Sequence, residues 1–330
     1  MKGRILKPLL GLIVAGIFSF MFLRQIELGR LMSAIASVNT GWLVGAFALL
    51  LLGYAARVAR WRQMLAIENP AISCQQCAGP FMAGFALNNV LPFRLGDVAR
   101  AFAFSQQLGV SPTLTLSTLV VERLLDLILI LLLLGVAIEV SGIGVNRLLG
   151  VSALALILLA SGALSLLLFP GLLTGLLHLG VRLLVRWLPR LGARVAPEVE
   201  QVERMLGKLA RRNTAAGLLL WSGLAWCAEG GVYWCLAKGL SALAVTEASW
   251  LALPVGTLAT LIPSTPGYVG TFDYFTMQAM HLSGNDFLAS AAYALLVHLM
   301  LWLPVTMIGG CYLLMSPMKK LVLSKEAKIE

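Results

Sequence analysis

Six long apolar stretches constrain this chain more than any other feature of its sequence. A helix that crosses a membrane needs about 20 mostly apolar residues. Stretches of this kind occupy residues 8–23, 42–61, 112–138, 148–170, 214–237 and 287–315. Only 12% of the residues are charged, whereas soluble domains carry about 25%. The sequence therefore predicts an all-α polytopic integral membrane protein with about six full spans.

The start of the chain resembles a secretory signal peptide, because Lys2, Arg4 and Lys7 precede an apolar run. A signal peptide would end in a cleavage site with small residues, and none occurs before Arg24. We therefore expect the first stretch to be retained as a membrane span.

Basic residues predict the orientation, because Lys and Arg concentrate on the cytoplasmic side of membrane proteins. They precede the first span, end the second at Arg57, Arg60 and Arg62, and recur in the tail at 319–330. With six spans, all these groups lie on one side, so both termini are predicted to be cytoplasmic. The basic segment 171–213 falls on the same side and is predicted to be an amphipathic linker, either simply solvated or bound to anionic lipid.

Two further apolar segments are too short to cross. Pro80–Leu91 and Leu251–Ile262 each hold about 12 residues, roughly 18 Å of helix against a hydrocarbon core of ~30 Å. Both are followed by Pro-x-x-x-Gly, as Pro92 to Gly96 and Pro263 to Gly267. We expect each segment to enter the membrane and turn back, forming re-entrant hairpins near residues 80–107 and 250–281.

The two hairpins occupy matching positions in the chain. Residues 1–140 and 141–318 both read span, span, hairpin, span, and the odd number of spans between the hairpins predicts opposite entry sides. Paired, broken segments in an inverted repeat point to a substrate site near the middle of the membrane, because unwound backbone there must line a cavity. The alternative is two ordinary kinked helices, which would give eight spans.

Three charged residues lie within the third span, in the sequence ERLLD. Glu122, Arg123 and Asp126 fall within one arc of a helix and share a face. Each charge costs roughly 2.5 to 3.5 kcal/mol in mid-membrane, so insertion requires partners.

The first hairpin supplies such partners. Arg94, Asp97 and Arg100 follow Pro92 and are preceded by Asn88 and Asn89. We hypothesise that the two carboxylates of the third span pair with Arg94 or Arg100. Cationic capacity would then remain for a substrate phosphate, which suits the donor fork of arginine. The alternative is a structural ion network that holds the hairpin to the span.

Two isolated carboxylates are candidates for coupling transport to protons or other ions. Glu229 lies alone in the fifth span, and intramembrane carboxylates are often functional. Asp273 follows the glycine-rich turn of the second hairpin and either caps the returning helix or serves the site. His281 and His298 are each isolated, which is typical of packing or hydrogen-bonding residues.

Signals for catalysis, cofactors or metals are scarce. Cys74 and Cys77 form a CxxC pair without a second pair or a histidine cluster nearby. The chain contains no P-loop, dinucleotide-binding, HExxH or GxSxG motif. The formal charge of +10 does not indicate nucleic-acid binding, since no soluble fold presents it. We therefore expect no enzymatic activity, no cofactor and no metal.

Three motifs in order resemble a known family. The runs LNNVLPFRLGDVARA, ER..D and PSTPGYVGTFDYF are similar to the transmembrane region of lysylphosphatidylglycerol synthases, a broad flippase-like membrane protein family. The resemblance covers nearly the whole chain. It implies a bacterial inner-membrane protein that moves lipid between leaflets, with two facing re-entrant hairpins. The chain ends soon after its last span, so we expect no aminoacyl-transferase domain and no lysyl transfer.

The combined prediction is a transporter for an anionic phospholipid or polyprenyl-phosphate-type lipid, with membrane lipids as its partners. The predicted substrate-binding residues are Asn88, Asn89, Pro92, Arg94, Gly96, Asp97, Arg100, Glu122, Arg123, Asp126, Pro263, Ser264, Thr265, Pro266, Gly267 and Gly270. One alternative is an intramembrane lipid-modifying enzyme with Glu122 or Asp126 as acid or base. Another is a non-transporting scaffold for a lipid-synthesis enzyme, and a homo-oligomer is compatible with each.

Overall fold

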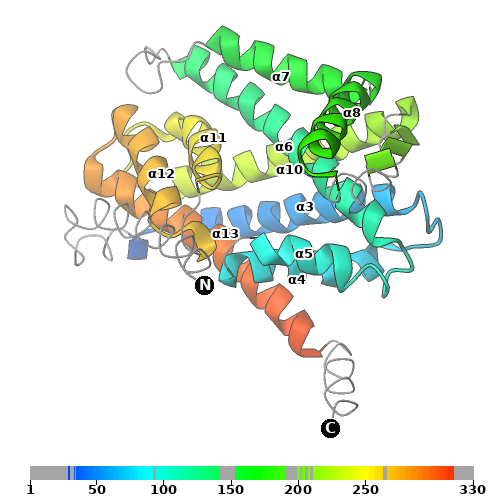
Figure 1. Cartoon of the computed structure of the whole chain (residues 1–330). Helices are drawn as coiled ribbons and strands as arrows, with labels where there is room; N and C mark the ends of the chain where they lie inside the picture. Colours follow the sequence, from blue (N-terminus) through cyan, green and yellow to red (C-terminus); the bar gives the residue numbers. More distant parts are fainter. Residues whose placement is uncertain are drawn as a thin grey trace, which may run out of the picture.

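The computed structural model describes residues 35–91, 94–141, 153–168, 170–189, 211–262 and 266–315, with a few single positions between them. Regular structure in these ranges is entirely helical (Figure 1), in agreement with the predicted all-α class. The helices are α3 (Thr40–Leu65), α4 (Cys74–Val90), α5 (Leu95–Phe102), α6 (Pro112–Ser141), α7 (Ala153–Leu168), α8 (Pro170–Trp187), α10 (Arg212–Gly239), α11 (Ser249–Ala259), α12 (Thr271–Leu282) and α13 (Phe287–Met315). Two short 3₁₀ turns, η3 (Thr246–Ala248) and η4 (Pro266–Tyr268), complete the set.

Most predicted spans correspond to single helices. The stretches 42–61, 112–138, 214–237 and 287–315 lie within α3, α6, α10 and α13, and α7 covers most of 148–170. The stretch 8–23 lies outside the described residues. In the described part, only α3 and α13 are long and apolar enough to cross a membrane by length and composition alone. The numbers of six and eight spans both stay predictions.

Local sequence explains where several helices begin and end. The Asn39 side chain accepts a hydrogen bond from the Gly41 amide at the start of α3. Ser73 and Gln76 form a capping box at the start of α4. The helix α8 ends at Trp187, two residues before Pro189, because a proline ring disfavours helical backbone ahead of it.

Each predicted hairpin is a pair of packed helices separated by a break. The helix α4 packs on α5, and α11 packs on α12. The prediction that the first short helix starts at Pro80 was wrong, because the capping box starts α4 at Cys74 and the helix includes Pro80. With 17 residues, α4 is roughly 26 Å long. The helix α11 has 11 residues, close to the expected length.

The hairpins are held by the longer helices. The helix α3 lies along α10, α4 packs against α13, and α11 contacts α6 (Figure 1). Buried apolar residues form two clusters, and α3 contributes to both, with Leu50 in one and Trp61 in the other. Arg57 lies between these two residues of α3 and lines a cavity. Polar groups therefore gather at the boundary between two apolar cores.

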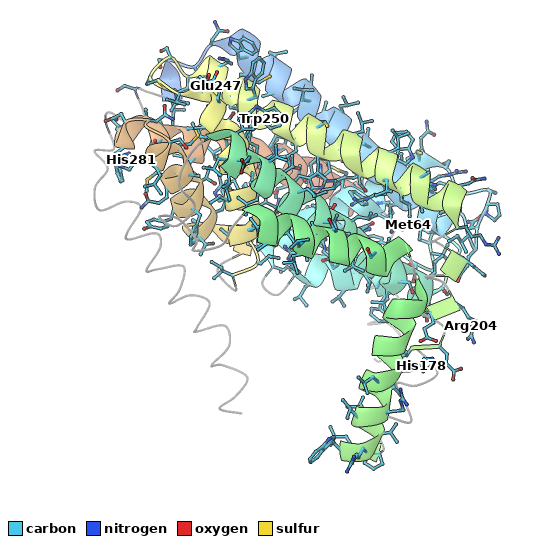
Figure 2. The ribbon with its side chains drawn as sticks, turned by 90° about the horizontal axis from the view of Figure 1, so that it is seen from above. Met64, His178, Arg204, Glu247, Trp250 and His281 are labelled. Atoms are coloured by element: carbon cyan, nitrogen blue, oxygen red, sulfur yellow. The ribbon has the colours of Figure 1, made fainter. Side chains whose placement is uncertain are left out.

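The outer surface is apolar along the helices expected to face lipid. Val44 on α3, Leu220 on α10 and Met307 on α13 are each at least 60% exposed. Exposed apolar side chains on long helices are expected in a membrane, where the surrounding solvent is hydrocarbon. The helix α8, which carries His178, extends away from the bundle (Figure 2). It covers residues 171–187 of the predicted linker 171–213, and much of the rest lies outside the described residues.

Candidate functional site

A cavity of about 420 Å³ lies between the two hairpins, and the long helices α3, α6, α10 and α13 complete its lining. Its polar lining consists of Tyr54, Arg57, Asn88, Asn89, Arg94, Arg123, Asp126, Trp226, Glu229, Tyr233, Thr257, Thr260, Tyr268, His298 and Trp302. A volume of a few hundred cubic ångströms matches the size of small-molecule sites in proteins. The cavity is therefore large enough for a polar group of several heavy atoms.

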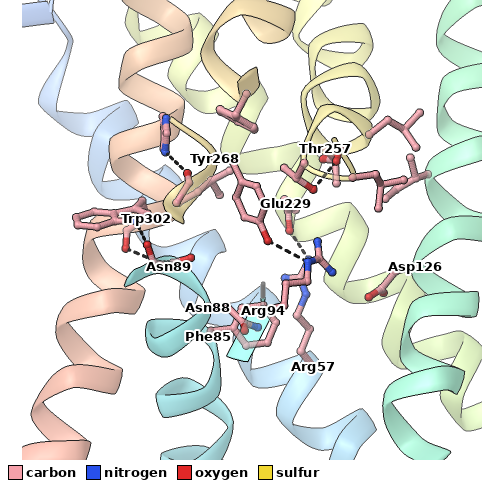
Figure 3. A pocket seen from close by; sticks show the side chains of 18 of the residues that line it. Arg57, Phe85, Asn88, Asn89, Arg94, Asp126, Glu229, Thr257, Tyr268 and Trp302 are labelled. Atoms are coloured by element: carbon pink, nitrogen blue, oxygen red, sulfur yellow. Dashed lines mark hydrogen bonds and ion pairs between the residues drawn. The ribbon is translucent and has the colours of Figure 1, made fainter. Parts of the chain in front are cut away.

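The tips of the two hairpins meet at this cavity through two residues with unusual backbone. Arg94 has φ 54° and Tyr268 has φ 61°, and they are the only non-glycine residues with positive φ in the described part of the chain. The Arg94 Nε donates a hydrogen bond to the Tyr268 hydroxyl over 3.0 Å (Figure 3). The guanidinium also lies 5.8 Å from the centre of the Tyr268 ring. Backbone strain of this kind persists at functional sites where the surrounding structure imposes it.

Hydrogen bonds within the first hairpin fix the position of Arg94. The Asn88 side-chain amide donates to Asp97 Oδ1 over 3.1 Å, and its oxygen accepts from the Asp97 backbone amide over 3.2 Å. Gly96 allows the two arms to approach closely, since an added Cβ would lie 1.9 Å from the Gly84 carbonyl oxygen. The beginning of α5 is thereby held against the last turns of α4.

The first hairpin is also fastened to α13. The Asn89 side-chain amide donates to the Thr306 hydroxyl over 2.9 Å and to the Trp302 carbonyl over 3.4 Å. The Trp302 indole donates back to the Asn89 carbonyl over 3.4 Å (Figure 3). These contacts hold the last turn of α4 beside the turn of the second hairpin.

The second hairpin is held by Asp273 and His298. One Asp273 oxygen accepts from the Gly270 amide over 2.9 Å, so Asp273 caps α12, one of the two roles considered for it. The other oxygen lies 2.7 Å from His298 Nδ1, and His298 Nε2 lies 2.9 Å from the Gly267 carbonyl oxygen. His298 therefore joins the cap of α12 to the turn that carries Tyr268.

The predicted pairing of Glu122 with Arg100 is confirmed. The two side chains form two parallel hydrogen bonds of 2.9 and 3.1 Å and are 2% exposed or less. The Arg100 guanidinium also lies over the rings of Trp61 and Phe81, at 4.4 and 4.5 Å. Neither Arg100 nor Glu122 lines the cavity, which favours the structural alternative for this pair.

The predicted pairing of Asp126 with Arg94 or Arg100 is wrong. Asp126 accepts instead from Arg60 over 2.8 Å and from the Trp226 indole over 3.2 Å. Arg60 belongs to α3, is only 1% exposed, and also donates to a hydroxyl of α10. Burial places its guanidinium within reach of α6, which the spacing of the sequence did not indicate. The carboxylate of Asp126 is thus neutralised by α3 rather than by the first hairpin.

Glu229 has a partner that was not predicted from the sequence. Its carboxylate forms an ion pair with Arg57 of α3 (Figure 3), whereas Lys238 pairs with Glu247. The Arg57 guanidinium also lies 5.6 Å from the Trp226 ring. The positive-inside rule predicts that Arg57 and Arg60 flank the membrane on the cytoplasmic side, but both are buried. Their burial removes two charges from the argument for the orientation.

The remaining ion pair joins α6 to the first hairpin. Arg123 Nη2 lies 3.4 Å from Asp97 Oδ2, and Arg123 Nη1 lies 3.9 Å from Asp126 Oδ2. The Arg123 side chain is 38% exposed, more than any other side chain in the ion pairs around the cavity. It is the most exposed of the paired arginines, and it lines the cavity.

These groups leave one positive charge without a carboxylate in the described cluster. The arginines are Arg57, Arg60, Arg94, Arg100 and Arg123. The carboxylates are Asp97, Glu122, Asp126 and Glu229. Five positive and four negative charges give a net charge of +1, with Arg94 as the unmatched member. Its neutral partner Tyr268 leaves its charge available to an anion.

The structure brings seven of the predicted site residues to the cavity wall. These are Asn88, Asn89, Arg94, Arg123, Asp126, Gly267 and the coupling candidate Glu229. Gly96, Asp97, Pro266, Gly270 and Asp273 lie in the hairpins, where Gly96, Asp97, Gly270 and Asp273 support the lining residues. Pro92, Pro263, Ser264 and Thr265 lie outside the described residues.

The aromatic part of the wall was not predicted from the sequence. Tyr54, Trp226, Tyr268 and Trp302 line the cavity beside the charges. Aromatic residues in apolar helices give no signal of their own, because they are equally common in packed cores. Tyr268 is the exception, since it follows Gly267 within a turn that had been singled out.

Comparison with known proteins identifies the family of this chain. The family described as "Lysylphosphatidylglycerol synthase TM region" matches residues 8–309. The chain belongs to this family. It is therefore a membrane protein of the lysylphosphatidylglycerol synthase transmembrane-region family, and the resemblance stated from its three motifs is confirmed.

A second comparison relates part of the chain to a single protein. A UPF0104 membrane protein of Methanocaldococcus jannaschii is 27% identical over 128 residues, which are 38% of this chain and 38% of the relative. The match spans well under two thirds of that protein. It agrees with a membrane location for this member of the family.

Proposed function

We propose that this protein carries an anionic lipid between the leaflets of a bacterial inner membrane. The observation that supports the proposal most is the position of Arg94. It is a cation without a carboxylate partner among the described residues, on the wall of a cavity between two broken helical hairpins. An arginine so placed suits a phosphate, which its donor fork binds with charge-assisted hydrogen bonds.

The size and lining of the cavity suit a lipid headgroup. A volume of about 420 Å³ accommodates a phosphate together with a small polar substituent. Thr257, Thr260 and Tyr233 also line the cavity, and their hydroxyls offer hydrogen bonds to that substituent. Acyl or polyprenyl chains would stay in the surrounding lipid. The substrate in this proposal is an anionic phospholipid or a polyprenyl-phosphate-type lipid.

Movement in this proposal comes from the two hairpins as re-entrant elements of an inverted repeat. The order α3, hairpin, α6 recurs as α10, hairpin, α13. Transporters built from inverted repeats expose a midplane site alternately by rocking one repeat against the other. The Arg94 to Tyr268 hydrogen bond joins the two tips, so an anion that captures Arg94 would also separate them.

The proposed activity is transport without covalent chemistry. Glu122 is enclosed by Arg100, and Asp126 is bound by Arg60 and Trp226. An acid or base must reach a reacting group to transfer a proton. The ion pairs of these two carboxylates favour the transport hypothesis over the lipid-modifying enzyme.

The test uses the full chain reconstituted in phosphatidylcholine vesicles with a trace of fluorescent phosphatidylglycerol or phosphatidic acid. A membrane-impermeant quencher reports the leaflet of the label. We expect the protein to accelerate exchange of an anionic label and not of labelled phosphatidylcholine. If neither anionic label exchanges faster than in protein-free vesicles, the proposal is contradicted for phospholipids. A labelled polyprenyl phosphate tests the second class of substrate in the same assay.

Variants of Arg94 test the site itself. Asparagine tolerates the left-handed backbone of this position, so Arg94→Asn removes the charge with little added strain. One hydrogen bond to a charged group contributes about 1.5 to 3 kcal/mol, so we expect about a tenfold or greater loss of anionic flux. Arg94→Lys should retain part of the flux. Arg182→Asn on exposed α8 is the matched control, and unchanged flux in Arg94→Asn would show that the headgroup is not bound there.

A further inference from the structure

The contacts of His298 require more protons than a neutral histidine carries. The Gly267 carbonyl oxygen can only accept, so Nε2 must carry a proton to bind it. The Asp273 oxygen at 2.7 Å from Nδ1 is also an acceptor when ionised. Making both contacts therefore needs a second proton, which lies between Nδ1 and the carboxylate. The pair is either imidazolium with carboxylate or neutral imidazole with carboxylic acid.

This second proton lies at the cavity. His298 lines the cavity with a side chain that is 12% exposed, and Asp273 behind it is 5% exposed. When the pair holds the proton, its net charge is zero; when the proton leaves, its net charge is −1. The pair also holds the Gly267 turn, which carries Tyr268 to Arg94. Loss of this one proton thus changes the charge of the wall and breaks one of the two His298 contacts that join Asp273 to the turn.

The charge count links this proton to an anionic headgroup. With the proton present, the described cluster has the net charge of +1 that Arg94 supplies, and a bound monoanion brings the sum to zero. Without the proton, the same complex has a net charge of −1. A net charge in the middle of a membrane costs several kcal/mol more than a neutral complex. The protonated pair is therefore the state that suits a bound anion.

We propose that Asp273 and His298 form a proton-binding site whose occupancy is linked to headgroup binding, so that an anionic lipid and a proton occupy the cavity together. This inference rests on the proposed function and adds the coupling ion to it. Coupling had been considered at Asp273 or Glu229, and the proposal assigns it to Asp273 with a histidine partner. Glu229 is already neutralised by Arg57.

Other titratable groups face the same cavity and must be separated from the pair. They are Arg94 and Tyr268 at the hairpin tips, Arg123 and Asp126 on α6, Arg57 and Tyr54 on α3, and Glu229 and Tyr233 on α10. The arginines stay charged throughout the neutral pH range. Asp126 and Glu229 are ion-paired. Variants of the Asp273–His298 pair are thus needed to assign any pH dependence.

The first experiment observes the proton directly. The chain has three histidines, so histidine-selective ¹⁵N labelling of the full protein in detergent micelles gives few ring signals, and His298→Gln identifies those of His298. We expect the His298 Nδ1 signal to change when the proton shared with Asp273 is lost, while Nε2 keeps the proton that binds Gly267. By reciprocal linkage, short-chain phosphatidylglycerol should move this transition to higher pH, and short-chain phosphatidylcholine should not. A transition that neither probe moves would overturn the linkage.

The second experiment measures flux of labelled phosphatidylglycerol against pH in vesicles. We expect wild-type flux to fall by about tenfold or more as the pair loses its proton at higher pH. A fall of this size corresponds to the loss of about one interaction with a charged group. His298→Gln and Asp273→Asn should remove the pH dependence, and asparagine retains an oxygen for the Gly270 amide. His281→Gln is the matched control, since His281 binds the Asn285 carbonyl outside the cavity.

The two proposals fail in different ways. Anionic flux that is equal at all pH values would overturn the proton site and leave the lipid transporter standing. A pH dependence that persists in both His298→Gln and Asp273→Asn would also overturn it. If no anionic lipid moves at any pH, the transport proposal fails, and the micelle titration alone then decides whether proton and anion binding are linked.

Discussion

Removal of the Glu122 charge tests whether the buried pair with Arg100 is structural. The substitution Glu122→Gln preserves the size of the side chain and leaves the Arg100 guanidinium charged in surroundings where it is fully buried. Breaking a buried ion pair from one side costs about 3 to 5 kcal/mol, because the remaining charge is uncompensated. The rings of Trp61 and Phe81 beside Arg100 offset part of that cost. We therefore expect a loss of about 3 kcal/mol in the free energy of unfolding.

The double substitution Arg100→Met with Glu122→Leu removes both charges and keeps apolar volume in the site. Replacing a whole buried pair with apolar residues is often neutral or stabilising, so the double variant should be more stable than Glu122→Gln. The assay is a denaturant titration of the protein in mixed micelles, with the single Arg100→Met and Glu122→Leu variants completing a double-mutant cycle. Lipid flux per folded molecule should stay near wild type in each variant, because the pair does not line the cavity.

Two results would refute this reasoning. A Glu122→Gln protein within about 1 kcal/mol of wild-type stability would mean that Arg100 is not held as a buried, uncompensated charge, since an unpaired buried charge costs several times more. A double variant that folds as wild type and transports no anionic lipid would mean that the pair takes part in binding. The second outcome would restore Arg100 and Glu122 to the substrate site.

Two further predictions test packing and charge. Gly309→Ala should destabilise the contact of α13 with α4 by about 1 to 3 kcal/mol, because its Cβ would lie 2.2 Å from the Met82 carbonyl oxygen. Gly310→Ala is the control, since its Cβ meets no atom within 4 Å and should not change stability. Equal stability of the two variants in a denaturant titration in micelles would contradict this prediction. Glu229→Gln should leave Arg57 without a carboxylate and raise the net charge of the cluster from +1 to +2. The higher charge should increase the flux of phosphatidic acid relative to that of phosphatidylglycerol. An unchanged ratio of these two fluxes would mean that the Arg57 charge does not act on the substrate.

The sequence predicted the helices better than the arrangement of their charges. The helix α13 could be located because residues 287–315 give a long, uninterrupted apolar signal. The hairpin breaks could be located because Pro92, Gly96 and Gly267 interrupt that signal. The start of α4 was missed because a capping box at Ser73 lies outside the apolar stretch and allows a helix to continue through Pro80.

Pairing of the charges depends on tertiary contacts that spacing does not contain. Arg100 and Glu122 are 22 residues apart and were matched correctly, because the first hairpin directly precedes the span that carries Glu122. Arg57 and Glu229 are 172 residues apart, and Arg57 had been assigned to the membrane surface by the positive-inside rule. That rule counts basic residues near the ends of spans, so it does not distinguish a flanking arginine from one buried on the inner face of α3.

The arrangement of charges explains why Arg94 in particular is left unmatched. Four arginines are paired with carboxylates, and two of those pairs, Arg57 with Glu229 and Arg60 with Asp126, join long helices to one another. These pairs resist reorganisation, because separating a buried pair is costly. Arg94 instead occupies the tip of a hairpin and binds a neutral hydroxyl, which an anion can replace without leaving a buried carboxylate unpaired. The charge that is free to respond to a substrate is therefore on the element whose movement transport would require.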